Sequence, residues 1–160
     1  MLFRSGLGGK GNEGVAATVD QTDGSIGYVE YAYALQNKMT HVQLKNKDGK
    51  FVQPKAEAFA AAAANADWAK APGFYMILTD QPGGASWPIT AATFILVYKN
   101  QDKPENAKHV LEFFNWAYGT DGDKLAQQLD YIPMPDNVVS MVQKEWKDNV
   151  KSKDGKALWQ

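Results

Sequence analysis

Cysteine is absent from the sequence, and arginine occurs once, as Arg4. Without cysteine the chain can form no disulfide bond, no thiolate nucleophile and no Cys-ligated zinc site. The formal net charge is −1, so no strongly basic surface is expected to attract nucleic acid or anionic lipid. The longest apolar run, residues 91–98, is much shorter than the ~20 residues that a membrane-spanning helix requires. These absences argue against a nucleic-acid-binding protein, a thiol enzyme and a membrane span.

The first residues of the chain do not resemble the start of an exported protein. Residues 1–5 contain neither the long apolar stretch nor the cleavage site of a signal peptide. They lead directly into the glycine-rich residues 6–14, which are typical of the interior of a fold. We therefore expect residues 1–5 to be a non-native start and the N-terminal portion of the fold to be missing.

The first part of the chain is predicted to mix helices and strands. Asn12 is a good N-cap, because its side-chain oxygen can accept a backbone N–H of the first helical turn. A short helix is expected over residues 32–37, and Asp48-Gly49 is typical of a hairpin turn. Runs rich in β-forming residues predict strands, namely residues 25–31, 41–45 and 51–52.

The middle of the chain contains one alanine-rich helix and two apolar runs. The helix is predicted over residues 57–66, and Phe59 and Trp68 must anchor it because alanine buries little surface. Residues 74–78 predict a strand. Residues 93–98 are apolar at both odd and even positions, which is typical of a strand buried on both faces of an α/β sheet.

The last third of the chain is predicted to be mostly helical. Pro104 suits the first turn of a helix. The apolar residues that follow it fall on one face at helical spacing and are expected to be buried, namely Ala107, Val110, Leu111, Phe114, Ala117 and Tyr118. Phe114 lies on the expected buried face, whereas Phe113 and Trp116 are expected to meet another lobe. The predicted helices cover residues 104–118, 124–129 and 136–150, with an extended connector over 131–135. The predicted fold class is therefore α/β.

Several motifs occur in the order found in one protein family. They are residues 8–15 (GGKGNEGV), 25–34 (SIGYVEYAYA), 87–90 (WPIT) with 93–96 (TFIL), 113–118 (FFNWAY) and 131–135 (YIPMP). Together they resemble the phosphate-binding proteins of bacterial phosphate ABC transporters, and the resemblance extends over nearly all of residues 6–160. One glycine-rich motif would be weak evidence, but the first four of these motifs in order are strong evidence, and residues 131–135 fit as well.

The resemblance implies a carrier, not an enzyme. Members of the family have two α/β lobes of the type II periplasmic-binding-protein fold, which close on one phosphate ion and deliver it to membrane permease subunits. It implies a monomer at the periplasmic or extracellular face of the membrane, with neither a cofactor nor a metal. On this basis residues 6–88 are expected to form part of the second lobe, and residues 89–160 the C-terminal part of the first. Trp87, Pro88, Ile89 and Thr90 are the expected hinge between them.

The residues that contact phosphate in this family are not found here. Phosphate is held by backbone N–H groups and hydroxyls at helix N-termini and by an arginine, and the resemblance places these mainly in the first half of the family's chain. No Ser-Gly-Thr-Ser segment occurs, and Arg4 lies in the five suspect residues. We expect the direct ligands outside this chain. Gly11 and Asn12 are weak candidates for supporting the site; the more ordinary interpretation is a tight turn that does not touch phosphate.

Two other functions stay open from the residues alone. The chain could be a self-contained scaffold or interaction domain, which is implied if residues 1–5 are native. It could also be an acid/base phosphohydrolase that uses paired carboxylates such as Glu30 with Asp67 or Asp80, although nothing in the sequence fixes their geometry. His41 and His109 have no motif partner, so surface positions are expected for both, and metal binding is not.

Overall fold

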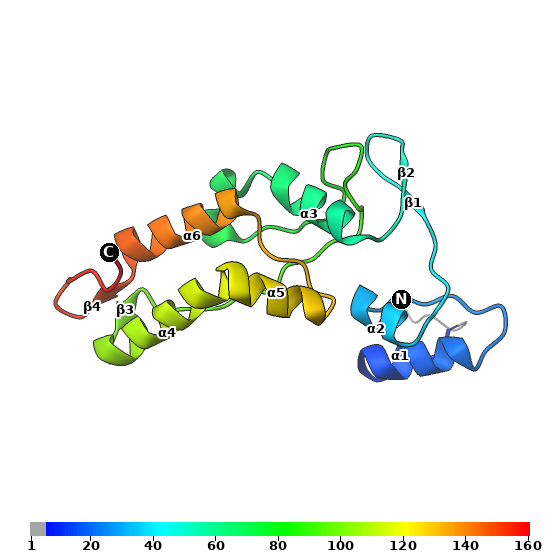
Figure 1. Ribbon diagram of the computed structural model, residues 1–160, viewed down its shortest axis with the longest axis horizontal. Coiled ribbons are helices and arrows are strands. Elements are labelled where there is room, and N and C mark those ends of the chain that lie inside the picture. Colours follow the sequence, from blue (N-terminus) through cyan, green and yellow to red (C-terminus); the bar gives the residue numbers. More distant parts are fainter. Residues whose placement is uncertain (1–5) are drawn as a thin grey trace. The chain divides into compact units, whose positions relative to one another are not determined.

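The computed structural model describes residues 6–160; the predicted non-native start, including Arg4, lies outside the described residues. The chain divides into two compact units, Met1–Val42 and Gln43–Gln160. Within the described residues, helices alternate with small two-stranded sheets (Figure 1). This mixture agrees with the predicted α/β class. No helix in this part of the chain is both long enough and apolar enough to span a bilayer.

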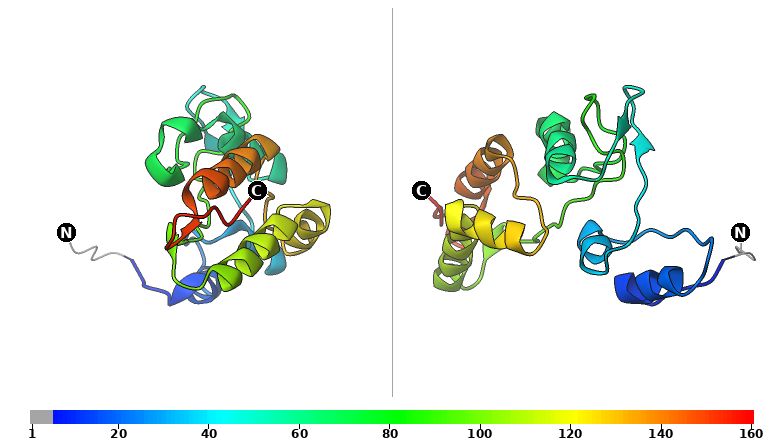
Figure 2. Two further views of the ribbon diagram at one scale, coloured as in Figure 1. Left: turned by 90° about the vertical axis from the view of Figure 1, so that its left-hand side faces the viewer. Right: turned by 45° about the vertical axis from the view of Figure 1, so that its right-hand side comes forward.

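The first unit is a pair of packed helices. Helix α1 covers Gly11–Asp20 and α2 covers Tyr31–Gln36; the two helices contact each other, and the right-hand view of Figure 2 shows them side by side. The predicted strand over residues 25–31 is wrong, because residues 25–30 form neither helix nor strand and Tyr31 begins α2. The side chain of Tyr28 is 90% exposed. A β-rich sequence needs a neighbouring strand, and none lies beside this segment in the described residues.

The second unit begins with a short antiparallel hairpin. Strands β1 (Leu44–Lys45) and β2 (Phe51–Val52) pair with Leu44 opposite Val52. The predicted turn at Asp48-Gly49 is confirmed: Gly49 has φ +78°, which glycine adopts without strain. The predicted strand over residues 41–45 is shorter than expected, because only its last two residues have a partner.

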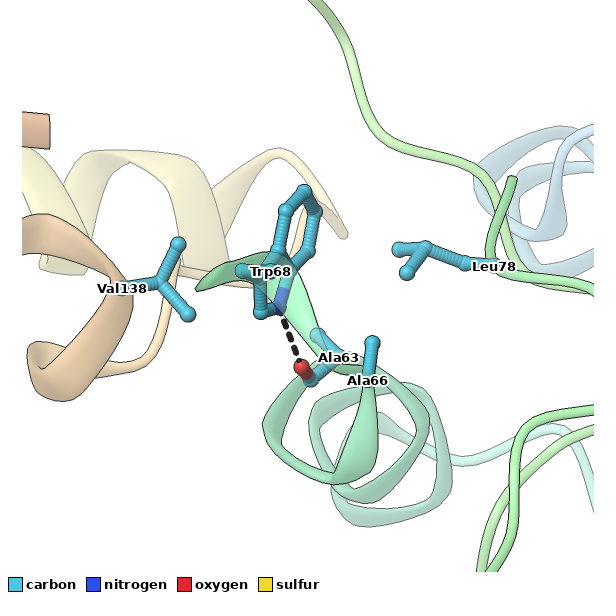
Figure 3. Close-up of a cluster of buried hydrophobic side chains, with 5 residues drawn as sticks. All are labelled: Ala63, Ala66, Trp68, Leu78 and Val138. Carbon is cyan, nitrogen blue, oxygen red and sulfur yellow. Dashed lines mark hydrogen bonds between the residues drawn. The ribbon is translucent and has the colours of Figure 1, made fainter. Parts of the chain in front are cut away.

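Helix α3 (Ala56–Asn65) confirms the alanine-rich prediction, and two short 3-10 turns follow it, η1 (Trp68–Lys70) and η2 (Pro72–Phe74). Trp68 anchors the helix as expected: it is buried, and its Nε1–H donates to the carbonyl of Ala63 at 2.7 Å. Figure 3 shows the Trp68 ring between Leu78 and Val138, with Ala63 and Ala66 beside it. This cluster is the first of two small cores.

The second core lies between two long helices. Helix α4 (Pro104–Ala117) and helix α6 (Asp136–Asn149) confirm their predictions, and α5 (Thr120–Gln128) begins a turn earlier than expected. Strands β3 (Asn100–Gln101) and β4 (Lys151–Ser152) pair in parallel close to the ends of these helices (Figure 1). The buried residues of this core are Ala107, Leu111, Trp146, Val150 and Leu158. Val110, predicted to face inward, is exposed instead.

Two predicted strands of this unit are absent. Residues 74–78 and 93–98 belong to no strand: Phe74 ends η2, and the green stretch that leads into β3 in Figure 1 carries no strand arrow. The prediction that residues 93–98 are buried on both faces is wrong, because Leu96 is 94% exposed. The physical reason is that no second strand among the described residues flanks this run, so its apolar side chains have nothing to pack between.

Candidate functional site

The glycine-rich loop and the start of α1 contain Gly11 and Asn12, the two residues considered as possible supports of a phosphate site. Gly11 has φ +68°, a left-handed conformation that strongly favours glycine. A Cβ atom at Gly9 would collide with the backbone of Gly14 and Val15, so the loop folds tightly onto the first turn of the helix. Both glycines are therefore explained by local backbone geometry, which is what a tight turn requires.

Asn12 was predicted to be the N-cap of α1, and this prediction is wrong. The helix begins at Gly11, and Lys10 occupies the N-cap position without a side-chain hydrogen bond. The Oδ1 atom of Asn12 instead accepts the backbone N–H of Glu30 at 2.9 Å. Asn12 thus ties the start of α1 to the residue that precedes α2, which is a structural contact between two helices.

A carboxylate already occupies the start of α1. Glu13 accepts hydrogen bonds from its own backbone N–H and from the Tyr33 hydroxyl, the latter at 3.0 Å, and these bonds hold the pKa of Glu13 below its ordinary value of 4.5. The positive end of the helix dipole favours the same ionised state. Glu13 is therefore negatively charged at neutral pH. Its carboxylate lies at the start of α1, the position at which a bound anion would need a hydrogen-bond donor.

A shallow hollow of about 400 Å³ lies between α1 and α2. Two of its lining residues, Glu13 and Asp20, carry carboxylates, and none is a lysine or an arginine. An anion in this hollow would meet negative charge without a compensating cation. The remaining lining residues are Ala16, Ala17, Gln21, Tyr33, Gln36 and Asn37.

The predicted hinge, residues 87–90, is held by backbone contacts in the second unit. The N–H of Trp87 donates to the carbonyl of Ala58 at 3.0 Å, and the N–H of Asp80 donates to the carbonyl of Pro88 at 2.9 Å. Trp87 and Thr90 are buried, whereas Ile89 is exposed. These contacts hold the start of the segment in place. They do not test whether one lobe rotates relative to the other about residues 87–90, so the hinge stays a prediction.

Sequence reasoning missed the polar cluster that positions this segment. The Nδ2 atom of buried Asn46 lies 3.1, 3.0 and 3.2 Å from the carbonyl oxygens of Gly83, Gly84 and Ser86. Its Oδ1 accepts the backbone N–H of Lys50 at 3.0 Å, which closes the β1–β2 hairpin. Asn46 therefore joins the hairpin to the loop before Trp87. The only sequence signal was an asparagine at the start of a predicted turn.

The other candidate residues lie on surfaces. His109 contacts Glu112 one turn away on α4, and His41 lies edge-on to Tyr31; both histidines are exposed, as predicted. Asp67 pairs with Lys70 at 2.6 Å on the surface. Among the described residues, no three His, Asp or Glu side chains cluster closely enough to hold a metal ion.

Comparison with known proteins decides the family relationship. The phosphate-binding protein PstS of Pasteurella multocida is 56% identical over 156 residues, which are 98% of this chain and 45% of that protein. The Haemophilus influenzae PstS is 52% identical over 92% of this chain and 44% of its own length. A PstS of Xylella fastidiosa is 51% identical over 91% of this chain and 40% of its own length. This chain is a homologue of the PstS phosphate-binding proteins. No protein-family model matches it.

The candidate site lies in a chain that matches only part of each PstS protein. The chain spans somewhat less than half the length of the PstS proteins that it matches. Its two packed cores and its polar cluster at Asn46 lie within that span, and so does the start of α1 with Gly11 and Asn12. The geometry at Gly11 and Asn12 favours the structural interpretation over an anion-binding one, but their part in a phosphate site stays a prediction.

Proposed function

We propose that this chain is part of the phosphate-binding component of an ABC importer, and that it contributes the supporting half of the fold while the direct phosphate ligands lie elsewhere. The single observation that carries the proposal is the 56% identity to a phosphate-binding protein PstS over 98% of the chain. At this level of identity over nearly the whole chain, the two proteins share a fold in the matched region.

The charges at the start of α1 support the second half of the proposal. A phosphate site combines backbone N–H groups, hydroxyls and an arginine, so that every oxygen of the ion has a donor. The first turn of α1 instead presents the carboxylate of Glu13, which accepts the hydroxyl of Tyr33. A charged acceptor there would oppose a phosphate ion, so the ligands are expected on other elements.

The proposed fold is a two-lobe binding protein of type II. Residues 6–88 belong to the second lobe, residues 89–160 to the C-terminal part of the first, and residues 87–90 form the crossing between them. The contacts of Trp87 with Ala58 and of Thr90 Oγ1 with the Trp87 carbonyl, at 3.0 Å each, would give such a crossing a fixed base. A hinge needs only a few residues that absorb rotation beside such a base.

The proposed role is to capture phosphate and deliver it to the importer, without converting it chemically. The partners would be inorganic phosphate and the permease subunits of the importer, met by a monomer at the periplasmic or extracellular face of the membrane. The resemblance to the phosphate-binding family supports each of these points, because the motifs at residues 25–34, 87–90 and 113–118 occur in the family's order.

Isothermal titration with phosphate at low salt tests the proposal. The expected result is weak or absent binding by this chain, with a Kd no tighter than about 1 mM. The Pasteurella multocida PstS is the positive control under the same conditions. A Kd below about 1 μM for this chain would contradict the proposal, because it would place the full set of ligands within these residues.

A further inference from the structure

The sequence contains four Asp-Gly pairs, at residues 23–24, 48–49, 121–122 and 154–155. At such a pair the backbone nitrogen of the glycine can attack the side-chain carboxyl carbon of the aspartate, because glycine has no side chain to hinder the approach. A new N–C bond closes a succinimide ring, and the carboxyl hydroxyl leaves with the nitrogen's proton as one molecule of water. Water then opens the ring at either carbonyl, which returns aspartate or yields isoaspartate.

The fold around each pair decides how readily this ring closes. The glycine nitrogen must swing toward the carboxyl carbon, so the aspartate backbone has to rotate. A glycine N–H that already donates a hydrogen bond must first give that bond up, and a local opening of this kind has a free-energy cost. A helix opposes the rotation throughout its length, since it fixes the backbone dihedral angles.

The pair at residues 23–24 lies in the loop that joins α1 to α2 (Figure 1). The N–H of Ser25 donates to the carbonyl of Thr22 at 3.1 Å, so Asp23 and Gly24 are the two central residues of a turn. Both are exposed, and Gly24 has φ +75°. Among the described residues, the Gly24 N–H has no backbone acceptor and the Asp23 carboxylate has no hydrogen-bond or ion-pair partner.

The pair at residues 48–49 occupies a turn one position later. The N–H of Gly49 is itself the closing donor, and it bonds to the carbonyl of Asn46 at 2.9 Å. The carboxylate is engaged as well, because Oδ1 of Asp48 accepts the N–H of Gly83 at 3.3 Å. Both reacting groups of this pair therefore have other partners.

The pair at residues 154–155 repeats the arrangement of the hairpin turn. The N–H of Gly155 donates to the carbonyl of Ser152 at 2.9 Å. The carboxylate of Asp154 accepts the Ser152 hydroxyl, a bond that holds the pKa of Asp154 below its ordinary value of 3.8. The nitrogen and the carboxyl group are thus both held, as they are at residues 48–49.

The pair at residues 121–122 lies inside helix α5. Gly122 is buried, and a Cβ atom there would lie 2.2 Å from the carbonyl oxygen of Ala117. The helical backbone and this close packing both oppose the rotation that ring closure needs.

We propose that Asp23-Gly24 is a modification site at which the folded chain forms succinimide and isoaspartate spontaneously, ahead of its other Asp-Gly pairs. The only co-reactant is water, and the site is independent of phosphate binding. Isoaspartate routes the backbone through the side chain and so adds a methylene group between α1 and α2. The change falls within the segment that the bond from the Glu30 N–H to Asn12 Oδ1 closes.

Ageing the purified chain at neutral pH and physiological temperature tests the proposal. Samples are digested at intervals, and the isomeric peptides are separated by liquid chromatography and assigned by electron-transfer mass spectrometry. Isoaspartate should accumulate at residue 23 at least about tenfold faster than at 48, 121 or 154, because the glycine N–H groups of those pairs are bonded or buried. Equal accumulation at any of the three would overturn the proposal.

Ageing in urea separates the fold from the neighbouring residues. Without the turns and α5, all four pairs should react at rates within about threefold of one another. A preference for residue 23 that persisted at full size in urea would contradict the proposal, because it would come from the local sequence alone.

Two matched substitutions complete the test. Asp23→Glu lengthens the side chain, so the succinimide ring cannot form there, and most of the isoaspartate made by the folded chain should disappear. Asp154→Glu makes the same change at an exposed pair whose groups are held, and should leave the total within about a fifth of its original value. Circular dichroism verifies that both variants fold. A total left unchanged by Asp23→Glu would overturn the assignment.

Discussion

The helices of the second unit and the segment at residues 91–98 differ in how far their apolar side chains are buried. Leu111 on α4 is 0% exposed, packed among Ala107 and Trp146, whereas Leu96 in the preceding extended run is 94% exposed. Both residues were predicted to be buried. Within the described residues, α4 therefore has packing partners, whereas no strand pairs with residues 91–98.

The cause lies in the range of the hydrogen bonds. A helix closes its bonds between residues four apart, so α4 and α6 need only their own sequence and one another. A strand closes its bonds with a segment that can lie anywhere in the chain. Strands β1 and β2, which do pair, are joined by a tight turn, so each lies close to its partner along the chain.

Matched leucine substitutions are the strongest way to break this comparison. Leu111→Ala should lower the free energy of unfolding by about 2–5 kcal/mol, because it leaves a cavity in a closed core. Leu96→Ala should change the free energy by less than about 0.5 kcal/mol, because the side chain contacts water. Urea unfolding followed by tryptophan fluorescence measures both. Similar losses from the two substitutions would show that residues 91–98 are packed and the comparison is wrong.

Local signals predicted the local structure. Pro104 correctly indicated the start of α4, and Asp48-Gly49 correctly indicated the hairpin turn. The β-rich residues 25–30 and 93–98 were wrongly predicted to form strands, because a side-chain pattern cannot report whether a partner strand is present. Motif order predicted the PstS relationship, which rests on similarity and needs no tertiary information.

The candidate site was predicted less well than the fold. Asn12 was expected to cap α1, but its oxygen bonds the backbone of Glu30, which lies eighteen residues along the chain. Asn46 was not singled out, although it bonds to three carbonyl groups at residues 83–86. Both errors have one cause: a polar side chain in a turn can bond locally or to a distant loop, and the sequence alone does not say which.

The smallest expected effect concerns the first unit, where a polar contact joins α1 and α2. Tyr33→Phe removes the hydroxyl that donates to Glu13, so the pKa of Glu13 should rise toward 4.5 and stay below it, because the bond from its own backbone N–H remains. NMR titration of the Glu13 carboxyl carbon measures the change. Tyr28→Phe is the control, since Tyr28 is exposed and lies outside both helices; an equal shift there would contradict the assignment.

The same lowered pKa sets the direction of the pH dependence. A carboxyl group whose pKa is lower in the folded state than in the unfolded state stabilises the fold above the unfolded value and loses this contribution as the pH falls. The contribution of Glu13 is thus complete above pH 4.5 and disappears as the pH drops through its lowered pKa. Tyr33→Phe should reduce this acid dependence without affecting Leu111 or its core.

Amide hydrogen exchange on the chain by itself tests most directly whether its extended segments lack partners. The amides of residues 92–98 should exchange within about tenfold of the rates of an unstructured peptide, and those around Leu111 in α4 should be slower by about a thousandfold. Protection of residues 92–98 equal to that of α4 would contradict the account, because it would show that the backbone groups of these residues are already hydrogen-bonded within the chain.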